Sequence, residues 1–545
     1  MVNKESFGER KARERAERKR QIRKEKELKA LERAMNEYKN GKKDKQPKEK
    51  PIPKVEWLPK IEPKPLSDTF DIDWEDNLTV TASDDLFKRI MNGEDINAQI
   101  LKMPPGTGKT AVIIRTLGLL QESDFGITKD KDEPLNIALV LPPNVYKQGS
   151  WLTTIGSYNY HHRDNQLNLS LYTTRDKFTN LLAHPKGFVK FINEYGFGKT
   201  KRSIVVIDEI HGYKNPVSKR AKQLQRLPNT VYRLGLSGTP LTNDEIIDGS
   251  SYLVMSGLYS SKTNFLKMHG LTHMFDDYKR LIVYDRETMK VNPNLYEKYP
   301  QFLSELGQVI FTPEIVRNIQ PEDVGMPTLH EKTIQLDFSK QMSDNLTSLK
   351  KAYQKKMFDT YTDVYMEIVK YIHEDNNRLD KLVELVKDEH VKQPLIFYKN
   401  TVVLDTIVER FKQENIPVRI INSEHKYEDV DKEDLSPIII QYYSGSEAIE
   451  FKHSNTTIMY QHQPSTSVLE QARKRNVRRN MFHDEDITLY YIVADNFIDQ
   501  AFYSRPLLRE RVNEDTGQLL NKIDTYGYNE SEIEEEVVKS LLDNY

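Results

Sequence analysis

The chain has 545 residues, which exceeds the size of one compact core, so we expect two or three domains. It contains no cysteine, which excludes disulfides and cysteine-ligated zinc or iron–sulfur centres. No apolar run approaches the ~18 residues of a membrane span, and the first residues lack the apolar core of a signal peptide, so we expect a cytoplasmic protein that is neither secreted nor held in a membrane.

Positive charge is concentrated at the N-terminus of a chain whose net charge is only −2. Residues 1–50 hold 19 Lys/Arg and 10 Asp/Glu, a net of +9, so the remainder carries a net of −11. Residues 4–40 are rich in good helix formers and predict an exposed helix, and the Lys- and Pro-rich residues 41–65 predict an extended linker. Such an arm fits contact with a polyanion, and it equally fits a solvated helix that aids solubility.

Short apolar runs alternate with helical patterns from about residue 72 onward, which is typical of parallel sheets covered by helices. Residues between the two series of runs are mostly helical in pattern, apart from the run at 331–338. We therefore predict an α/β fold of two parallel-sheet lobes with a helical insertion. The runs lie at 98–103, 136–142, 203–208 and 231–238 in the first series, and at 393–400, 416–422, 437–444, 456–462 and 487–495 in the second.

The same patterns divide the chain into five predicted segments. The acidic tail has an amphipathic helical pattern, which predicts a packed helix or, like the N-terminal helix, a surface for a protein partner. The segments are a basic helix and linker (1–65), a first α/β lobe (66–241), a helical insertion and inter-lobe connection (242–385), a second lobe (386–510) and an acidic helical tail (511–545).

The stretch MPPGTGKTAVII, residues 103–114, lies between a predicted strand and a predicted helix, as a phosphate-binding loop requires. Glycines let backbone N–H groups turn inward around phosphate oxygens, and the helix N-terminus adds partial positive charge. Met103 occupies the position where the usual motif has glycine, but it ends the strand and need not touch phosphate. A chance Gly-rich turn is the alternative. The residues predicted to bind ATP are Pro105, Gly106, Thr107, Gly108, Lys109 and Thr110, with Lys109 on the β/γ-phosphates and Thr110 on Mg²⁺.

A second motif, DEIH at residues 208–211, follows the apolar strand 203–208. At the mouth of a parallel sheet Asp208 can hold Mg²⁺, and Glu209 can orient or deprotonate the attacking water. His211 is expected to link this loop to the next motif by hydrogen bonding. The two motifs together predict a nucleotide-hydrolysing site with ATP and Mg²⁺ as cofactors.

The order of motifs resembles superfamily 2 helicases, and within them the Swi/Snf group of ATPases. IALVLPPNVYKQGSW (137–151), with its Trp151, is similar to motif Ia, DEIH to the Walker B motif, and LGLSGTPLTN (234–243) to motif III. Residues 311–341, 394–411, 442–461 and 467–480 resemble the exit from the first lobe and motifs IV, V and VI. Motif V departs from the pattern, with SEAIEF in place of its usual run, and Gln99 lies too close to the loop to be the adenine-reading glutamine.

The resemblance implies that two RecA-like lobes enclose ATP. It assigns Arg478 as the arginine finger, Arg475 as a second γ-phosphate contact and Gln471 as a further residue of motif VI, although a basic helix that binds nucleic acid is the alternative for this cluster. It also implies that Ser237 and Thr239, with His211, couple the nucleotide to the nucleic acid.

The resemblance further implies an ATP-dependent DNA translocase or helicase that acts in replication, recombination or transcription. An ATP-binding nucleic-acid switch or scaffold with little turnover, and an RNA-directed helicase, are the two alternatives. Frequent Lys, Asn, Ile and Tyr are typical of an AT-rich genome, such as that of a phage, virus or plasmid.

Overall fold

The structure is a computed structural model, and part of the chain lies outside the residues that it describes. That part includes residues 1–60 of the predicted arm and linker and nearly all of the predicted acidic tail. The described residues are 61–66, 71–93, 96–104, 106–126, 135–197, 202–241, 246–275, 281–288, 300–318, 326–358, 360–422, 424–425, 435–442, 451, 453–462, 466–477, 486–494 and 538–539.

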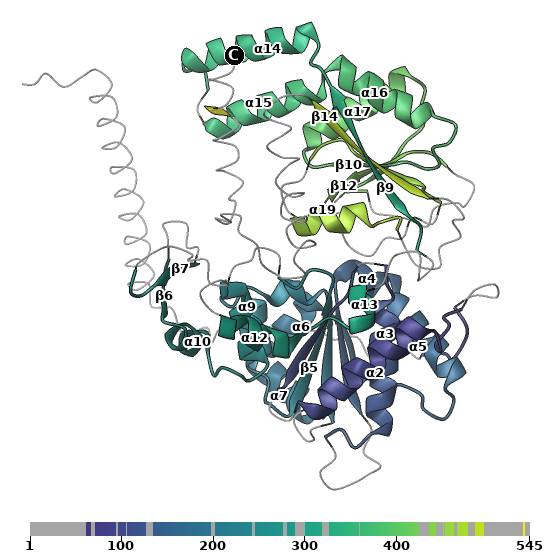
Figure 1. Cartoon of the computed structure of the whole chain (residues 1–545), viewed down its shortest axis with the longest axis vertical. Coiled ribbons are helices and arrows are strands. Elements are labelled where there is room, and N and C mark those ends of the chain that lie inside the picture. The colour runs from purple at the N-terminus through teal and green to yellow at the C-terminus, as the bar shows by residue number, and fades with distance from the viewer. Residues whose placement is uncertain are drawn as a thin grey trace, which may run out of the picture. The chain divides into compact units, whose positions relative to one another are not determined.

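The first lobe is built on a six-stranded sheet in which all neighbouring strands are parallel (Figure 1). The strand order is β3-β2-β4-β5-β1-β8. Every run of the first series predicted as a strand is a strand, whereas the short strands β3 and β8 were not predicted. The bounds are Ala98–Lys102 (β1), Asn136–Leu141 (β2), Leu171–Thr174 (β3), Ser203–Asp208 (β4), Val231–Ser237 (β5) and Ile310–Phe311 (β8).

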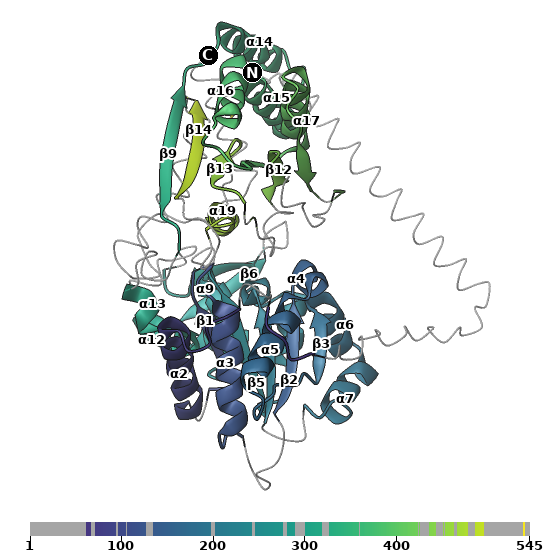
Figure 2. The same ribbon diagram turned by 90° about the vertical axis from the view of Figure 1, so that its right-hand side faces the viewer.

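Helices cover both faces of this sheet, which is why its strands are mostly buried and mainly apolar (Figure 1). On one face α2 (Asn77–Asn92), α3 (Lys109–Glu122) and α5 (Ser150–His161) lie side by side and share a continuous hydrophobic core with the strands (Figure 2). The other helices of this lobe are α4 (Pro143–Gln148), α6 (Arg175–Ala183), α7 (Pro185–Asn193), α8 (Lys219–Gln225), α9 (Ile246–Met255), α10 (Lys262–Met268), α12 (Pro300–Val309) and α13 (Glu314–Asn318).

The second lobe has a six-stranded parallel sheet of its own, in the order β11-β12-β10-β13-β14-β9. Its strands are β9 (Leu329–Leu336), β10 (Leu395–Tyr398), β11 (Arg419–Ile421), β12 (Ile438–Gln441), β13 (Thr456–Met459) and β14 (Ile487–Ala494). Its helices are α14 (Lys340–Gln354), α15 (Tyr361–His373), α16 (Asn376–Lys387), α17 (Thr401–Gln413) and α19 (Thr466–Arg473). The predicted α/β fold of two parallel-sheet, RecA-like lobes is thereby confirmed.

Successive residues of the second sheet face opposite cores, as the two-residue period of a strand requires. In β10, Ile396 and Tyr398 pack with α14–α17, whereas Leu395 and Phe397 pack in the cluster that contains α19. Val538, from the tail, is fully buried in the cluster of α14–α17.

The segment predicted as a helical insertion supplies strands to both sheets. Its residues form α9 to α16 and an antiparallel hairpin, β6 (Leu271–Phe275) with β7 (Leu281–Asp285). They also form β8, which pairs with β1 of the first sheet, and β9, which pairs with β14 of the second along eight residue positions. The sequence boundaries of the five segments remain a prediction. Among the described residues, none of the helices combines the length and apolar character that crossing a membrane requires.

Close packing of α3 against α5 yields a stability prediction. A Cβ on Gly118 would lie 1.9 Å from the hydroxyl oxygen of Tyr158, whose side chain is buried. Gly118→Ala should therefore destabilise the first lobe by about 1–3 kcal/mol, as overpacked cores do. The matched control is Gly307→Ala in α12, where nothing lies within 4 Å of an added Cβ, so we expect no loss or a gain of about 0.5–1 kcal/mol. Thermal unfolding of both variants measures the difference, and equal midpoints would contradict it.

Candidate nucleotide-binding site

The candidate site lies at the carboxyl edge of the first sheet. β5 lies between β1 and β4, and its register pairs Lys102 of β1 with Ser237 and Asp208 of β4 with Leu236. The loop after β1, the acidic end of β4 and the end of β5 are therefore neighbours. Ligand sites of open α/β sheets occur at this edge.

The loop after β1 has the backbone of a phosphate cradle. Gly106 and Gly108 have φ angles of 84° and 89°, in the left-handed region that favours glycine, and α3 begins directly afterward at Lys109. The hydroxyl of Thr107 donates to the carbonyl of Pro104 at 2.8 Å, which closes the turn. A Cβ on Gly108 would meet nothing within 4 Å, so open space adjoins the loop. Pro105 lies outside the described residues.

The contacts of Met103 and Lys109 explain how the motif can begin with a methionine in place of glycine. The Met103 side chain is fully buried in the core between the sheet and its helices, while its carbonyl accepts a hydrogen bond from Lys109 Nζ at 3.2 Å. Lys109 Nζ also donates to the carbonyl of Pro104 at 3.1 Å. The departure from glycine at this position thus changes core packing and leaves the loop backbone in place.

The Asp208 carboxylate is held by donors at both oxygens. The indole Nε1 of Trp151 donates to Oδ2 at 3.1 Å, and the backbone N–H of Glu209 donates to Oδ1 at 2.9 Å. Burial raises the pKa of Asp208 and the charge of Glu209 raises it further, whereas the bond from Trp151 and the charge of Lys109 oppose the rise. Sequence reasoning placed Trp151 in motif Ia and did not anticipate its bond to Asp208.

Glu209, His211 and Ser237 form a polar network between the ends of β4 and β5. His211 Nδ1 lies 3.1 Å from Glu209 Oε2 and 3.2 Å from Ser237 Oγ, and the Ser237 hydroxyl donates to Glu209 Oε2 at 3.4 Å. The backbone N–H of Thr239 donates to Ser237 Oγ at 3.1 Å. The structure therefore brings together the three residues predicted to couple the nucleotide to the nucleic acid.

The network keeps Glu209 ionised. Burial alone would raise the pKa of Glu209, but the hydrogen bond from His211 and the electrostatic influence of His211 and Lys109 outweigh it and lower the pKa. Two adjacent carboxyl groups thus have pKa values shifted in opposite directions. Such a pair is typical of functional sites.

Glu209 also has a strained backbone. Its φ of 51° and ψ of 56° are left-handed, which is uncommon for any residue but glycine, asparagine or aspartate. The following residue, Ile210, packs tightly on β5, where a Cβ on Gly235 would lie 2.9 Å from the Ile210 Cβ. This packing helps to hold the turn that presents the Glu209 side chain.

The donor set fits a nucleotide with Mg²⁺. Asp208 offers carboxylate oxygens and Thr110 a hydroxyl oxygen, which are the ligand types that Mg²⁺ takes. Lys109, the start of α3 and the open space beside Gly108 suit phosphate oxygens.

The predicted residues of the second lobe are only partly described. Gln471 is half-buried on α19, and Arg475, two residues beyond that helix, is 4% exposed. Arg473 pairs with Glu331 of β9 and so belongs to the packing of its own lobe. Arg478 lies outside the described residues. The catalytic roles of Gln471, Arg475 and Arg478 remain predictions.

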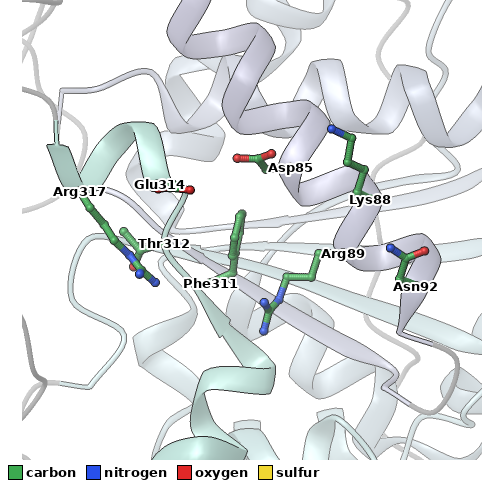
Figure 3. Close-up of a pocket in the computed structure, with 8 residues that line it drawn as sticks. All are labelled: Asp85, Lys88, Arg89, Asn92, Phe311, Thr312, Glu314 and Arg317. Atoms are coloured by element: carbon green, nitrogen blue, oxygen red, sulfur yellow. The ribbon is translucent and has the colours of Figure 1, made fainter.

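A pocket of about 720 Å³ lies beside α2, β8 and α13, and its lining contains none of the predicted site residues (Figure 3). The guanidinium of Arg89 lies 5.1 Å from the ring centroid of Phe311, and its Nε donates to the buried Gln99 at 2.9 Å. Burial lowers the pKa of Arg89, and the charge of Arg317 lowers it further. Gln99 therefore holds Arg89. The lining residues are Asp85, Lys88, Arg89, Asn92, Phe311, Thr312, Glu314 and Arg317.

The left-handed backbone of Glu209 predicts a difference between two variants that both lack its side chain. Glu209→Gly should be more stable than Glu209→Ala by about 1 kcal/mol, because only glycine relieves the steric cost of this conformation. Chemical denaturation of the two proteins measures the difference. Equal stabilities would mean that this turn relaxes freely once the Glu209 side chain is removed.

Comparisons with known proteins address the identity of the chain. The chain matches the SNF2-related domain family over residues 30–382, which is more than half of its length. No curated protein matches it. Among solved structures it is similar to the Sulfolobus solfataricus SWI2/SNF2 ATPase core in complex with dsDNA, at 15% identity and a TM-score of 0.33, over 89% of this chain and 98% of that chain. The family match, which agrees with the resemblance of the motifs, shows that this chain belongs to the SNF2-related family of helicase-like ATPases.

Proposed function

We propose that this protein is an ATP-dependent DNA translocase or helicase that couples ATP hydrolysis to movement on DNA in replication, recombination or transcription. The observation that carries the proposal is the network of Glu209, His211 and Ser237 beside the loop of Lys109, in a chain of the SNF2-related family. Membership of the family supports nucleotide hydrolysis, and the network supports its coupling to a second ligand.

The first lobe would bind the nucleotide and prepare the attacking water. Lys109 exchanges its present carbonyl partners for phosphate oxygens, and the backbone of residues 106–110 surrounds the same phosphates. Asp208 and Thr110 would hold Mg²⁺, which neutralises charge on the phosphates when it is bound. Glu209 is ionised at neutral pH, so its carboxylate can orient the attacking water or accept its proton, although its lowered pKa makes it a weaker base.

The second lobe would supply positive charge to the transition state. Arg475 is the second candidate by its place in motif VI, and it is 4% exposed. Arg478 is the finger candidate by its place in motif VI. Developing charge on the transferred phosphoryl group requires such a cation.

Coupling of the nucleotide to the nucleic acid would involve the residues at the ends of β4 and β5. A change in the hydrogen bonding of Glu209 on hydrolysis reaches Ser237 directly and through His211, and Ser237 holds the backbone of Thr239. Residues beyond Thr239 can then shift as the nucleotide state changes.

Lys109→Ala should abolish ATP hydrolysis, because it removes the cation aimed at the β/γ-phosphates. The control is Lys88→Ala, which replaces an exposed lysine of α2 in the same lobe and should leave ATP hydrolysis normal.

ATP hydrolysis by the wild-type protein is measured without nucleic acid and with duplex DNA, single-stranded DNA or RNA. DNA-stimulated turnover supports the proposal, RNA-selective stimulation supports an RNA helicase, and binding without turnover supports a switch or scaffold. Triplex displacement beside forked-duplex unwinding then separates tracking from strand opening.

Arg478→Ala should lower the rate of hydrolysis by about 10³–10⁵-fold, the effect of removing an arginine finger. Nucleotide binding should persist, since Lys109 and the loop are untouched. Arg475→Ala should also reduce hydrolysis. Arg419→Ala, on β11 of the same lobe, is the control for the general effect on hydrolysis of removing an arginine from this lobe. Single-turnover kinetics with DNA measures the three rates. Normal hydrolysis by both Arg475→Ala and Arg478→Ala would rule out the assigned role of motif VI.

A further inference from the structure

The carboxylate of Asp208 is fixed by two donors that come from different parts of the first lobe. The N–H of Glu209 is local to the turn, whereas the indole of Trp151 comes from a residue 57 positions earlier. Each carboxylate oxygen accepts one of these bonds, which leaves further lone-pair sites on both oxygens for another ligand. The two bonds together fix the plane and rotation of the carboxylate.

The topology explains how Trp151 reaches this position. β2 is the neighbour of β4, and the chain leaves the carboxyl end of β2 through α4 and Gly149, whose φ is 67°. α5 then begins at Ser150, so Trp151 lies in its first turn, near the same edge of the sheet as Asp208. The side chain is 1% exposed, and a buried indole N–H is normally hydrogen-bonded.

We propose that Trp151 is a positioning residue for Asp208, the carboxylate assigned to Mg²⁺, and that it acts through Asp208 without touching the nucleotide. The proposal rests on the proposed function, because that function assigns the metal to Asp208. Replacing a group that hydrogen-bonds to a metal ligand typically costs about 10–100-fold in metal affinity or activity. Trp151 would thus set how tightly the site binds magnesium–nucleotide, while the phosphate loop would bind metal-free nucleotide independently.

Trp151→Phe removes the donor and keeps an aromatic side chain, and the lobe offers a matched control. Trp74 is also buried, at 3% exposed, and its Nε1 donates to Ser157 Oγ at 3.1 Å, on the same helix α5. Trp74→Phe therefore removes an indole hydrogen bond away from Asp208, one that is made to a hydroxyl instead of a carboxylate. Thermal unfolding of both variants reports the general cost of losing such a bond.

The test measures binding of the non-hydrolysable analogue AMPPNP to the full chain by calorimetry, with Mg²⁺ and with EDTA. Trp151→Phe should weaken binding in Mg²⁺ about 10-fold or more, the range for lost support of a metal ligand. Binding in EDTA should match wild type, and Trp74→Phe should match wild type in both buffers. In a background of Asp208→Ala, adding Trp151→Phe should have no further effect, because the carboxylate through which it acts is gone.

A second measurement leaves Trp151 intact, in case its variant does not fold. The chain has three tryptophans, so protein labelled with ¹⁵N-tryptophan gives three indole N–H signals, which the variants assign. Asp208→Ala should move the Trp151 signal upfield by removing its acceptor, and Mg²⁺ with AMPPNP should shift it in wild type. The Trp74 signal should stay in place in both cases.

The outcomes separate this inference from the proposed function. Wild-type protein that binds no AMPPNP in Mg²⁺ would overturn both. Normal wild-type binding with equal losses in Trp151→Phe and Trp74→Phe, or an equal loss in EDTA, would overturn only the role of Trp151. An indole signal of Trp151 that stays in place both in Asp208→Ala and on addition of Mg²⁺ with AMPPNP would also overturn only the role of Trp151.

Discussion

The hydrogen-bond ladder that joins β1, β5 and β4 in parallel sets the position of every described site residue in the first lobe. Its register places Lys102, Ser237 and Asp208 at one edge, so the phosphate loop and the acidic turn emerge beside each other. A slip by one residue would exchange the faces of a strand, and the buried apolar residues on both faces prevent it. The placement of these loops at one edge is therefore a consequence of core packing.

The carboxyl edge of the first sheet carries two features that cost stability in a folded protein. Asp208 and Glu209 are adjacent carboxyl groups, and Glu209 has a left-handed backbone. Trp151 and His211 compensate by donating to them from α5 and from the turn itself. Strain and paired carboxylates that persist under such support are characteristic of functional sites, where stability is exchanged for preorganisation.

Local patterns allowed much of this arrangement to be predicted from the sequence. The apolar runs identified most strands, and the glycines and lysine of the loop identified the cradle, because each is encoded by neighbouring residues. Contacts between distant residues were not predictable. Arg202 looks like a surface residue in the sequence, yet it is buried and donates to carbonyls at the end of α3, and Arg378 likewise donates to carbonyls of Tyr460 and Ile492. The two-residue strand β8 is too short to carry a periodic signal.

Met103 shows that the effect of a departure from a motif depends on the structural role of the altered position. In the fold its side chain belongs to the hydrophobic core, and only its carbonyl, which every residue has, faces Lys109. The phosphate cradle needs backbone N–H groups, two glycines with positive φ and a lysine, and all the described parts of it are present. A large apolar residue at the first position is therefore compatible with the cradle, because it packs inward. Gly106 and Gly108 do not tolerate such a replacement, since a Cβ would disfavour the left-handed backbone conformation that the cradle requires.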